Sequence, residues 1–457
     1  MSWSELPPPP ATNPGNDLPC IQVRPPGPES RTWLTRLGHA QAPMGPRRNP
    51  AAPSSTVVLA SGKGSNVLDV DSNRYVDLAA GFGALLVGHG NDQVLRAAEL
   101  QSARLLQALG DVYPSDAKIG LLTRLGELLP ARHTQCILGQ SGSDAVSAAL
   151  KTAALATGRP GILAFEGAYH GLGYGPLSAL GLRPSYRAPF SSQLNPHVRF
   201  APYPSTESAL DATLSTAEAA LREGAIGAVL VEPILGRGGV MVPPTQFLPE
   251  LARVSREHGA LLIADEVWTG LGRSGSWLAS VEAGITPDLV CLGKGLGGGL
   301  PLSACLGAAE LMAEWSRAEE VVHTSTFAGA PLACATALAT LDVLHRQRLV
   351  ERAAEVGARW RSALAERAER AAGVEVRGAG LMVGIDATSL EGGAGALQRR
   401  LLEQGYLTST GGGERDVLVL TPPLTIAEPL LHAFTDALET ALTELAPRGG
   451  PAGRRAP

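Results

Sequence analysis

The sequence predicts an α/β protein with a largely parallel sheet, and three features of its 457 residues support this prediction. Short apolar runs, typical of strands, alternate with longer helical patterns beyond about residue 100, which is the order of βαβ units. Polar residues follow directly after several of these runs, and a lysine, Lys294, follows the last one, just before a glycine-rich loop. Because ligands of open parallel sheets bind beyond the carboxyl ends of the strands, these polar residues mark the expected site.

The N-terminal region divides into two parts. Thirteen of the 35 prolines lie in residues 1–53, including PPPP at 7–10, and apolar clusters are few there, which favours an extended or poorly ordered arm. Between residues 57 and 81, short alternating strands surround a turn at 71–73. We therefore expect a small antiparallel unit after the arm.

The rest of the chain supplies the main sheet and a second, smaller unit. Strand candidates lie at 136–138, 162–165, 226–231, 261–264 and 289–292. A helix rich in Ala, Arg and Glu is expected from 341 to about 371, followed by the strand-like VEVRG and VLVL and a final helix, which indicates a smaller α+β domain. The chain then divides into an arm (1–55), the N-terminal part of the small domain (56–100), a large domain (101–340), the C-terminal part of the small domain (341–446) and a tail (447–457).

Composition and charge exclude several classes of function. Hydrophobic residues make up 44% of the chain, charged residues 18%, and the formal net charge is −5, so no basic field is available for nucleic acid or an anionic membrane surface. The five cysteines are odd in number and scattered, without metal-ligand spacing, which argues against a disulfide framework and a metal site. The N-terminus lacks a secretory pattern and no apolar run reaches the length of a membrane span. We expect a soluble cytoplasmic protein that acts on small molecules.

The lysine at 294 stands out because lysine is rare in this chain. The 38 basic residues include only four lysines, at positions 63, 118, 151 and 294. A guanidinium cannot serve as a nucleophilic amine, whereas a lysine amine can lose its proton and form a Schiff base with a carbonyl. Lys151 lies next to an apolar helical stripe and is interpreted as solvated. Lys294 is therefore the candidate nucleophile.

Carboxylates and an aromatic residue follow the neighbouring strand candidates. Asp265 and Glu266 come after 261–264, Glu232 comes after 226–231, and Tyr169 and His170 lie beyond 162–165. The carboxyl ends of parallel strands share one edge of a sheet, so these side chains are expected to converge with Lys294.

A candidate phosphate cradle lies in CILGQSGSDAVSAAL at 136–150. Ser141 or Ser143 can cap the helix, and Gly142 permits a close approach to its free N–H groups. A nucleotide-binding loop is a poor alternative. The Gly-Lys pair of SGKGS at 61–65 resembles the end of a phosphate loop. However, Val57 stands where that loop needs its first glycine, and Gly64 stands where it needs Ser or Thr.

Six stretches, in order along the chain, resemble the class III aminotransferases, which use pyridoxal phosphate on the fold type I scaffold. This resemblance implies a large cofactor-binding domain with a mainly parallel sheet and a smaller α+β domain built from both chain ends. It covers residues from about 59 to 442. The stretches are SGSDAVSAALK (141–151), GAYHG (167–171), VEPILGRGGV (231–240), IADEVWTGLGRSG (263–275), PDLVCLGKGLGGGLPLSA (287–304) and TSTFAGAPLACA (324–335).

The resemblance assigns roles to the candidate residues. It implies that Lys294 forms the Schiff base and that Asp265 pairs with the pyridine nitrogen, which keeps the ring electron-accepting. Gly142 and Ser143 would hold the phosphate, and Thr326 would reach the phosphate of a neighbouring subunit in a homodimer.

The ring of the cofactor would lie between two further side chains. Tyr169 would stack on one face and Val267 would pack on the other, while Glu232 would support the cofactor from the surrounding shell. His170 is interpreted as a residue that hydrogen-bonds the fold around Tyr169.

Three positions depart from the family pattern. Arg237 stands where many relatives that use glutamate carry Glu, and Val419 stands where its Arg partner would be. Trp268 replaces a frequent Gln near the ring oxygen of the cofactor. Arg237 and Trp268 are therefore candidate substrate residues, and the usual glutamate-dependent substrates are in doubt.

We interpret the chain as an aminotransferase that moves an amino group between an amine or amino acid and a keto acid. Two alternatives stay open at this point. One is a racemase, epimerase or lyase on the same scaffold, which differs in where the proton returns or which bond breaks. The other is a non-catalytic protein that only binds pyridoxal phosphate, although the presence of both Lys294 and Asp265 argues against it.

Overall fold

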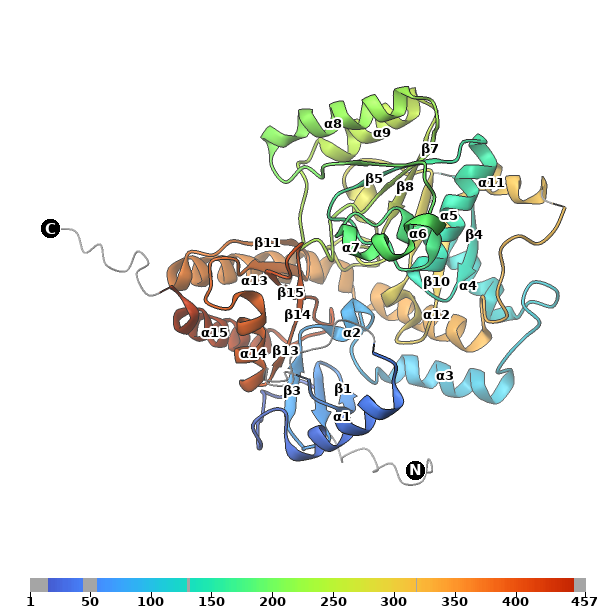
Figure 1. Ribbon diagram of the computed structural model, residues 1–457. Helices are drawn as coiled ribbons and strands as arrows, with labels where there is room; N and C mark the ends of the chain where they lie inside the picture. Colours follow the sequence, from blue (N-terminus) through green and yellow to red (C-terminus); the bar gives the residue numbers. More distant parts are fainter. Residues whose placement is uncertain (1–14, 44–55, 130–131, 318, 448–457) are drawn as a thin grey trace.

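The computed structural model in Figure 1 describes residues 15–43, 56–129, 132–317 and 319–447. A seven-stranded sheet lies within the elements drawn from teal through green to yellow, and two four-stranded sheets lie toward the two chain ends. No described helix combines the length and apolar character that crossing a membrane requires.

The seven-stranded sheet has the order β4-β10-β9-β8-β7-β5-β6. Strands β5 to β9 pair in parallel, whereas β10 is antiparallel to both β9 and β4. The expected mainly parallel sheet is confirmed, and every strand candidate between 136 and 292 lies in it. The strands are β4 (Thr134–Gly139), β5 (Gly161–Phe165), β6 (Val198–Ala201), β7 (Ile226–Val231), β8 (Leu261–Asp265), β9 (Leu289–Leu292) and β10 (Ser303–Ala308).

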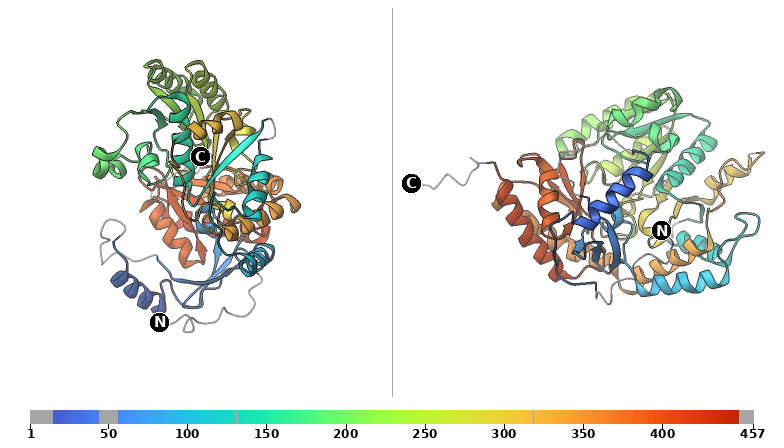
Figure 2. Two further views of the ribbon diagram at one scale, coloured as in Figure 1. Left: turned by 90° about the vertical axis from the view of Figure 1, so that its right-hand side faces the viewer. Right: turned by 60° about the horizontal axis from the view of Figure 1, so that its bottom comes forward.

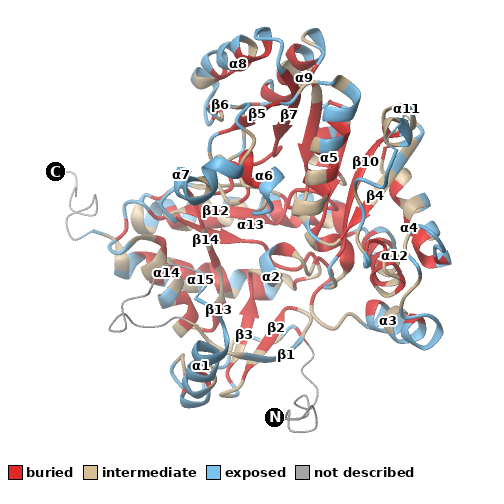
Figure 3. Ribbon diagram, turned by 45° about the vertical axis from the view of Figure 1, so that its right-hand side comes forward, coloured by how far each residue is buried: buried red, intermediate tan, exposed pale blue. Residues whose placement is uncertain are grey.

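Helices cover both faces of this sheet, which explains why its strands read as continuous apolar runs. Alternate residues of a strand point to opposite faces, so Leu163 and Val229 pack with α8 (Glu207–Arg222) and α9 (Phe247–Glu257). Ile162 and Leu230 belong instead to the core beneath α5 (Gly142–Thr157). Figure 3 shows these strands as a buried layer between helices whose outer faces are exposed.

One of the two smaller sheets combines both ends of the chain, and the other is built from C-terminal strands alone. The hairpin strands β1 (Leu59–Lys63), β2 (Asn66–Asp69) and β3 (Arg74–Asp77) form the expected antiparallel unit, and β13 (Tyr406–Leu407) joins β3 in parallel. The other sheet has the order β11-β12-β15-β14 and includes the expected strands VEVRG and VLVL. Its members are β11 (Val376–Ala379), β12 (Met382–Asp386), β14 (Ser409–Gly411) and β15 (Val417–Leu420).

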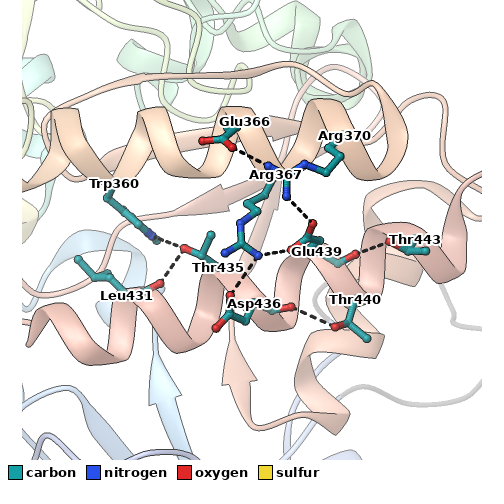
Figure 4. Close-up of polar contacts among 10 residues, drawn as sticks. All are labelled: Trp360, Glu366, Arg367, Arg370, Leu431, Thr435, Asp436, Glu439, Thr440 and Thr443. Atoms are coloured by element: carbon teal, nitrogen blue, oxygen red, sulfur yellow. Dashed lines mark hydrogen bonds and ion pairs between the residues drawn. The ribbon is translucent and has the colours of Figure 1, made fainter.

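Two long helices pack side by side in the C-terminal part, α13 (Leu349–Ala372) and α15 (Glu428–Leu445). The Trp360 indole of α13 donates a hydrogen bond to Thr435 Oγ1 of α15 at 3.2 Å (Figure 4). Arg367 forms ion pairs with Asp436 and Glu439 along the helix edge. The apolar faces fix the packing, because partly exposed ion pairs of this kind add little stability.

The single helix expected over 341–371 is wrong. The structure has two helices, α12 (Pro331–Arg346) and α13, and the chain turns at Arg348, whose φ is 50°. A left-handed residue cannot continue a right-handed helix, and here neither Gly nor Pro marks the break in the sequence.

The expected arm also differs from the structure where the structure describes it. Residues 28–40 form α1 (Pro28–Ala40), which Figure 2 shows beside the N-terminal hairpin. The carboxylate of Asp71 accepts hydrogen bonds from the backbone N–H groups of Glu29 and Ser30, at 2.8 and 2.9 Å. These bonds attach the start of the helix to the turn between β2 and β3. The remaining arm residues, 1–14 and 44–55, and the tail from 448 lie outside the described residues.

The other helices connect these layers. They are α2 (Ala80–Gly83), α3 (Asp92–Arg104), α4 (Asp116–Gly126), α6 (Tyr174–Ser178), α7 (Pro184–Arg187), η2 (Ala188–Gln193), α10 (Ala279–Glu282), η3 (Lys294–Gly297), α11 (Ala309–Met312), η4 (Ala313–Arg317) and α14 (Gly393–Glu403).

Candidate active site

The polar residues predicted from the strand ends follow four adjacent strands. Lys294 lies just beyond β9, Asp265 ends β8, Glu232 follows β7, and Tyr169 follows β5. These strands are consecutive neighbours in the sheet, so their carboxyl ends share one edge. The order of elements therefore brings the four side chains to the place where an open parallel sheet binds ligands.

Asp265 is held by His170, which was expected only to support the fold around Tyr169. His170 Nδ1 lies 2.8 Å from Asp265 Oδ2, and both side chains are buried. Asp265 Oδ1 accepts a hydrogen bond from Val267 N at 3.1 Å. The only available signal for His170 was its position next to Tyr169. The pair fixes a carboxylate at the floor of the site.

Glu232 joins two loops of the site. One carboxylate oxygen accepts a hydrogen bond from Tyr169 N at 2.7 Å, and the other accepts one from Gly236 N at 3.0 Å. Burial raises the pKa of Glu232 to about 7, with a smaller opposing effect from His170. Glu232 is therefore a support that fixes the backbone of both loops.

Lys294 has the properties of a reactive amine. Burial lowers its pKa to about 8, while the nearby charges of Asp265 and Glu232 act in the opposite direction. The ammonium nitrogen lies 4.5 Å from the centroid of the Trp268 ring, a cation–π contact. Its φ of 41° places the residue in the left-handed region at the start of the glycine-rich loop.

The other three lysines are engaged elsewhere. Lys63 bonds to Asp92, Lys118 bonds to Asp111, and Lys151 donates to the carbonyl of Val322. Within the described part of the chain, Lys294 Nζ has no hydrogen-bond or ion-pair partner. A lysine without a polar partner in a desolvated position is suited to react.

The residues of the predicted phosphate cradle lie at the start of α5. Ser141 is the N-cap and forms a capping box with Asp144, so the helix begins at Gly142. A Cβ atom placed on Gly142 would lie only 2.7 Å from Val267 Cγ1, which is too close for any other residue without a shift. Ser143 Oγ accepts a hydrogen bond from Gly173 N at 3.1 Å. The helix start therefore packs closely against Val267.

Thr326 is not brought into contact with these residues. Its side chain is exposed, and its carbonyl accepts a hydrogen bond from Gln107 at 2.7 Å. The preceding residue, Ser325, accepts a hydrogen bond from Gln140, which lies just before the N-cap of α5. The loop thus passes near the start of α5, and the Thr326 hydroxyl has no hydrogen-bond partner among the described residues.

The two candidate substrate residues have contrasting surroundings. Trp268 is buried in an apolar cluster with Val419, and its Nε1 has no hydrogen-bond partner among the described residues. The other members of the cluster are Ile234, Val240, Met382 and Val417. Arg237 is half-buried, and its guanidinium lies 5.3 Å from the centroid of the Tyr169 ring.

Comparison with known proteins identifies the family. The model of the family "Aminotransferase class-III" matches residues 49–442. The diaminobutyrate–2-oxoglutarate aminotransferase of Rhizobium meliloti is 37% identical over 88% of this chain and 89% of its own length. An alanine/serine racemase of Pyrococcus horikoshii is 31% identical, over 94% and 93% respectively. A PLP-bound amine transaminase from an uncultivated Pseudomonas species has a TM-score of 0.80 at 31% identity, covering 89% of this chain and 98% of that structure.

The residues at the sheet edge fit pyridoxal phosphate. The cofactor needs an amine for its aldehyde, a carboxylate for its ring nitrogen and N–H donors for its phosphate. The site offers an unpartnered lysine, the buried Asp265 and a helix start where a glycine avoids a clash. The buried Nε1 of Trp268 also lacks a partner here and is a further free donor.

The family match, the relatives and the fit of the site agree. The chain belongs to the class III aminotransferases and is a pyridoxal-phosphate-dependent enzyme that transfers an amino group between an amino donor and a keto acid.

Proposed function

We propose that Lys294 carries pyridoxal phosphate as a Schiff base and that Asp265 pairs with its ring nitrogen. When bound, the cofactor supplies a conjugated ring that accepts electrons from the substrate Cα. The observation that carries the proposal is that Lys294 is desolvated, has no hydrogen-bond or ion-pair partner among the described residues, and lies within electrostatic reach of the buried carboxylate of Asp265 at the end of the adjacent strand. A negative Asp265, oriented by His170, favours a protonated ring nitrogen.

Lys294 also serves as the proton carrier in this proposal. A pKa of about 8 allows the amine to take up and return a proton near neutral pH, which is the requirement for a general base that later acts as an acid. The cation–π contact with Trp268 supports the protonated form during this exchange.

The remaining assignments concern cofactor contacts. Gly142 and Ser143 bind the phosphate at the N-terminus of α5, and Tyr169 and Val267 contact the two faces of the ring. These assignments are supported by the close packing of Gly142 against Val267 and by the hydrogen bond that attaches the Tyr169 loop to Glu232. We assign cofactor binding to residues 101–340 and the small domain to 56–100 with 341–446.

A homodimer with shared sites is the proposed assembly. Thr326 is exposed beside Val321 and Phe327, whose side chains are 76% and 58% exposed. Apolar side chains this exposed on a loop near the cradle are suited to cover by a second subunit, which would receive Thr326 at its phosphate. The five free cysteines accord with a reducing cytoplasmic location.

A half-reaction screen tests the proposed chemistry. Holoprotein is mixed with single amines or amino acids, and the visible absorbance of the bound cofactor is followed together with the appearance of keto product. We expect stoichiometric keto product without an acceptor and none with Lys294→Ala. Formation of the opposite enantiomer without any keto product would indicate racemisation instead.

A further inference from the structure

Arg237 is a cation without a counter-charge beside the proposed catalytic lysine. Among the residues that the structure describes, its side chain makes no hydrogen bond or ion pair, and its Nε is shielded from solvent without a partner. A partly desolvated guanidinium without a carboxylate is unfavourable, because its lost hydration is not replaced. An anion that binds from solution would compensate for this lost hydration.

The backbone around Arg237 is held by hydrogen bonds on both sides, which fixes the point from which its side chain extends. The carbonyl of Arg237 accepts a hydrogen bond from Gly412 N at 2.8 Å, and Leu235 and Met241 form a β-bridge across the turn. Gly236 N donates to Glu232. The turn is therefore attached to the strand β7 on one side and to the β14–β15 connection on the other.

The guanidinium of Arg237 lies close to the proposed reacting groups. It lies over the ring of Tyr169, and its positive charge lowers the pKa values of both Tyr169 and Lys294, although burial has the opposite and larger effect on Tyr169. A charge that acts on Lys294 also acts on a substrate attached there. Arg237 thus lies within electrostatic reach of the site of chemistry.

No side chain of the site competes for this charge. Both oxygens of Glu232 already accept backbone N–H groups. The neighbouring positions Val419, Ile234 and Met382 form an apolar cluster with Trp268. Among the described residues, no carboxylate forms an ion pair with Arg237, so its guanidinium has no internal counter-charge.

We propose that Arg237 is the carboxylate-binding residue of the substrate pocket and that it receives an acid group of the keto acid and of an acidic amino donor. This inference rests on the proposed aminotransferase site. A keto acid necessarily brings a carboxylate, and the planar guanidinium can hold it through two parallel hydrogen bonds. The ring of Tyr169 supports the guanidinium from one face.

The direct test measures carboxylate binding without turnover. Butyrate and glutarate, which have no amino or keto group, are titrated into holoprotein by calorimetry. The variants are Arg237→Leu, Arg237→Lys and, as the matched control, Arg199→Leu, which removes an exposed arginine on the edge strand β6. We expect Arg237→Leu to weaken binding by about 10- to 100-fold, Arg237→Lys to weaken it less, and Arg199→Leu to leave it unchanged. Unchanged thermal unfolding and cofactor absorbance establish that the variants fold.

Three amino donors identify which acid group is bound. Alanine has only an α-carboxylate, 4-aminobutyrate only a distal one, and 1-butylamine has none. Arg237→Leu should raise the Michaelis constant for one or both acids and spare 1-butylamine.

Equal carboxylate binding by the parent and Arg237→Leu, or no binding by the parent, would overturn the inference. A different outcome separates the two proposals. If Arg237→Leu loses carboxylate binding but the parent transaminates no donor, the proposed function is contradicted while the carboxylate site at Arg237 is supported.

Discussion

The reactivity of Lys294 toward the cofactor should depend on pH in a way set by its burial. Only the neutral amine attacks an aldehyde, and desolvation lowers the pKa of Lys294 from the ordinary 10.5 to about 8. At pH 7.5 roughly a quarter of the amine is then neutral, against roughly one part in a thousand for a solvated lysine. The difference is a rate advantage of roughly 200-fold at the same intrinsic reactivity.

The assay is capture of pyridoxal phosphate by cofactor-free protein, followed by stopped-flow absorbance from pH 6 to 10. The rate should rise with pH through about 8 and then level off, because the fraction of neutral amine saturates. The charge of Asp265 raises this pKa and that of Arg237 lowers it, so Asp265→Asn should move the midpoint down and Arg237→Leu should move it up. A midpoint near 10.5 in the parent, or one common midpoint in all three proteins, would refute the reasoning.

Three further predictions concern the support of the site. His170→Phe leaves Asp265 without its ring partner and should slow the half-reaction at saturating donor by at least about tenfold, with cofactor still bound; an unchanged rate would remove His170 from positioning. Gly142→Ala places a Cβ 2.7 Å from Val267 and should weaken cofactor affinity, measured by fluorescence titration, whereas Gly120→Ala, which meets only a contact at 3.5 Å, should not. Burial raises the pKa of Glu232 from 4.5 in the unfolded chain to about 7 in the folded one, so the parent should lose stability as pH rises through this range. Between pH 5 and pH 8, the free energy of unfolding of Glu232→Gln should therefore rise by up to about 3 kcal/mol relative to that of the parent. An equal pH dependence of the two proteins would contradict this.

The sequence predicted the strands that build the site because each is an apolar run that ends in a polar residue. β10 escaped this reasoning, since SACLGA consists mostly of small residues and gains its place by antiparallel pairing with β4 and β9. The break at Arg348 has no local signal, and the helix α1 depends on the side chain of Asp71, more than thirty residues away. Long-range hydrogen bonds of this kind leave no periodic trace in the sequence.

In the site, too, some features have a local signal in the sequence and others depend on long-range contacts. Lys294 and Asp265 could be named as candidates from their motifs, and the replacement of the family's Glu–Arg pair by Arg237 and Val419 was visible in the sequence. The bond between His170 and Asp265 joins residues 95 positions apart, and the contact of Arg237 with Tyr169 depends on how two loops pack. Chemistry could be read from residue types, whereas orientation required the folded chain.

The central claim is that Lys294 holds the cofactor, and borohydride reduction of the holoprotein tests it most directly. Reduction makes the link between the amine and the cofactor permanent, so peptide mass mapping locates it on one of only four lysines. We predict a single modified peptide containing Lys294, at one cofactor per chain. Label found mainly on Lys63, Lys118 or Lys151, which the structure engages with other partners, would contradict the account.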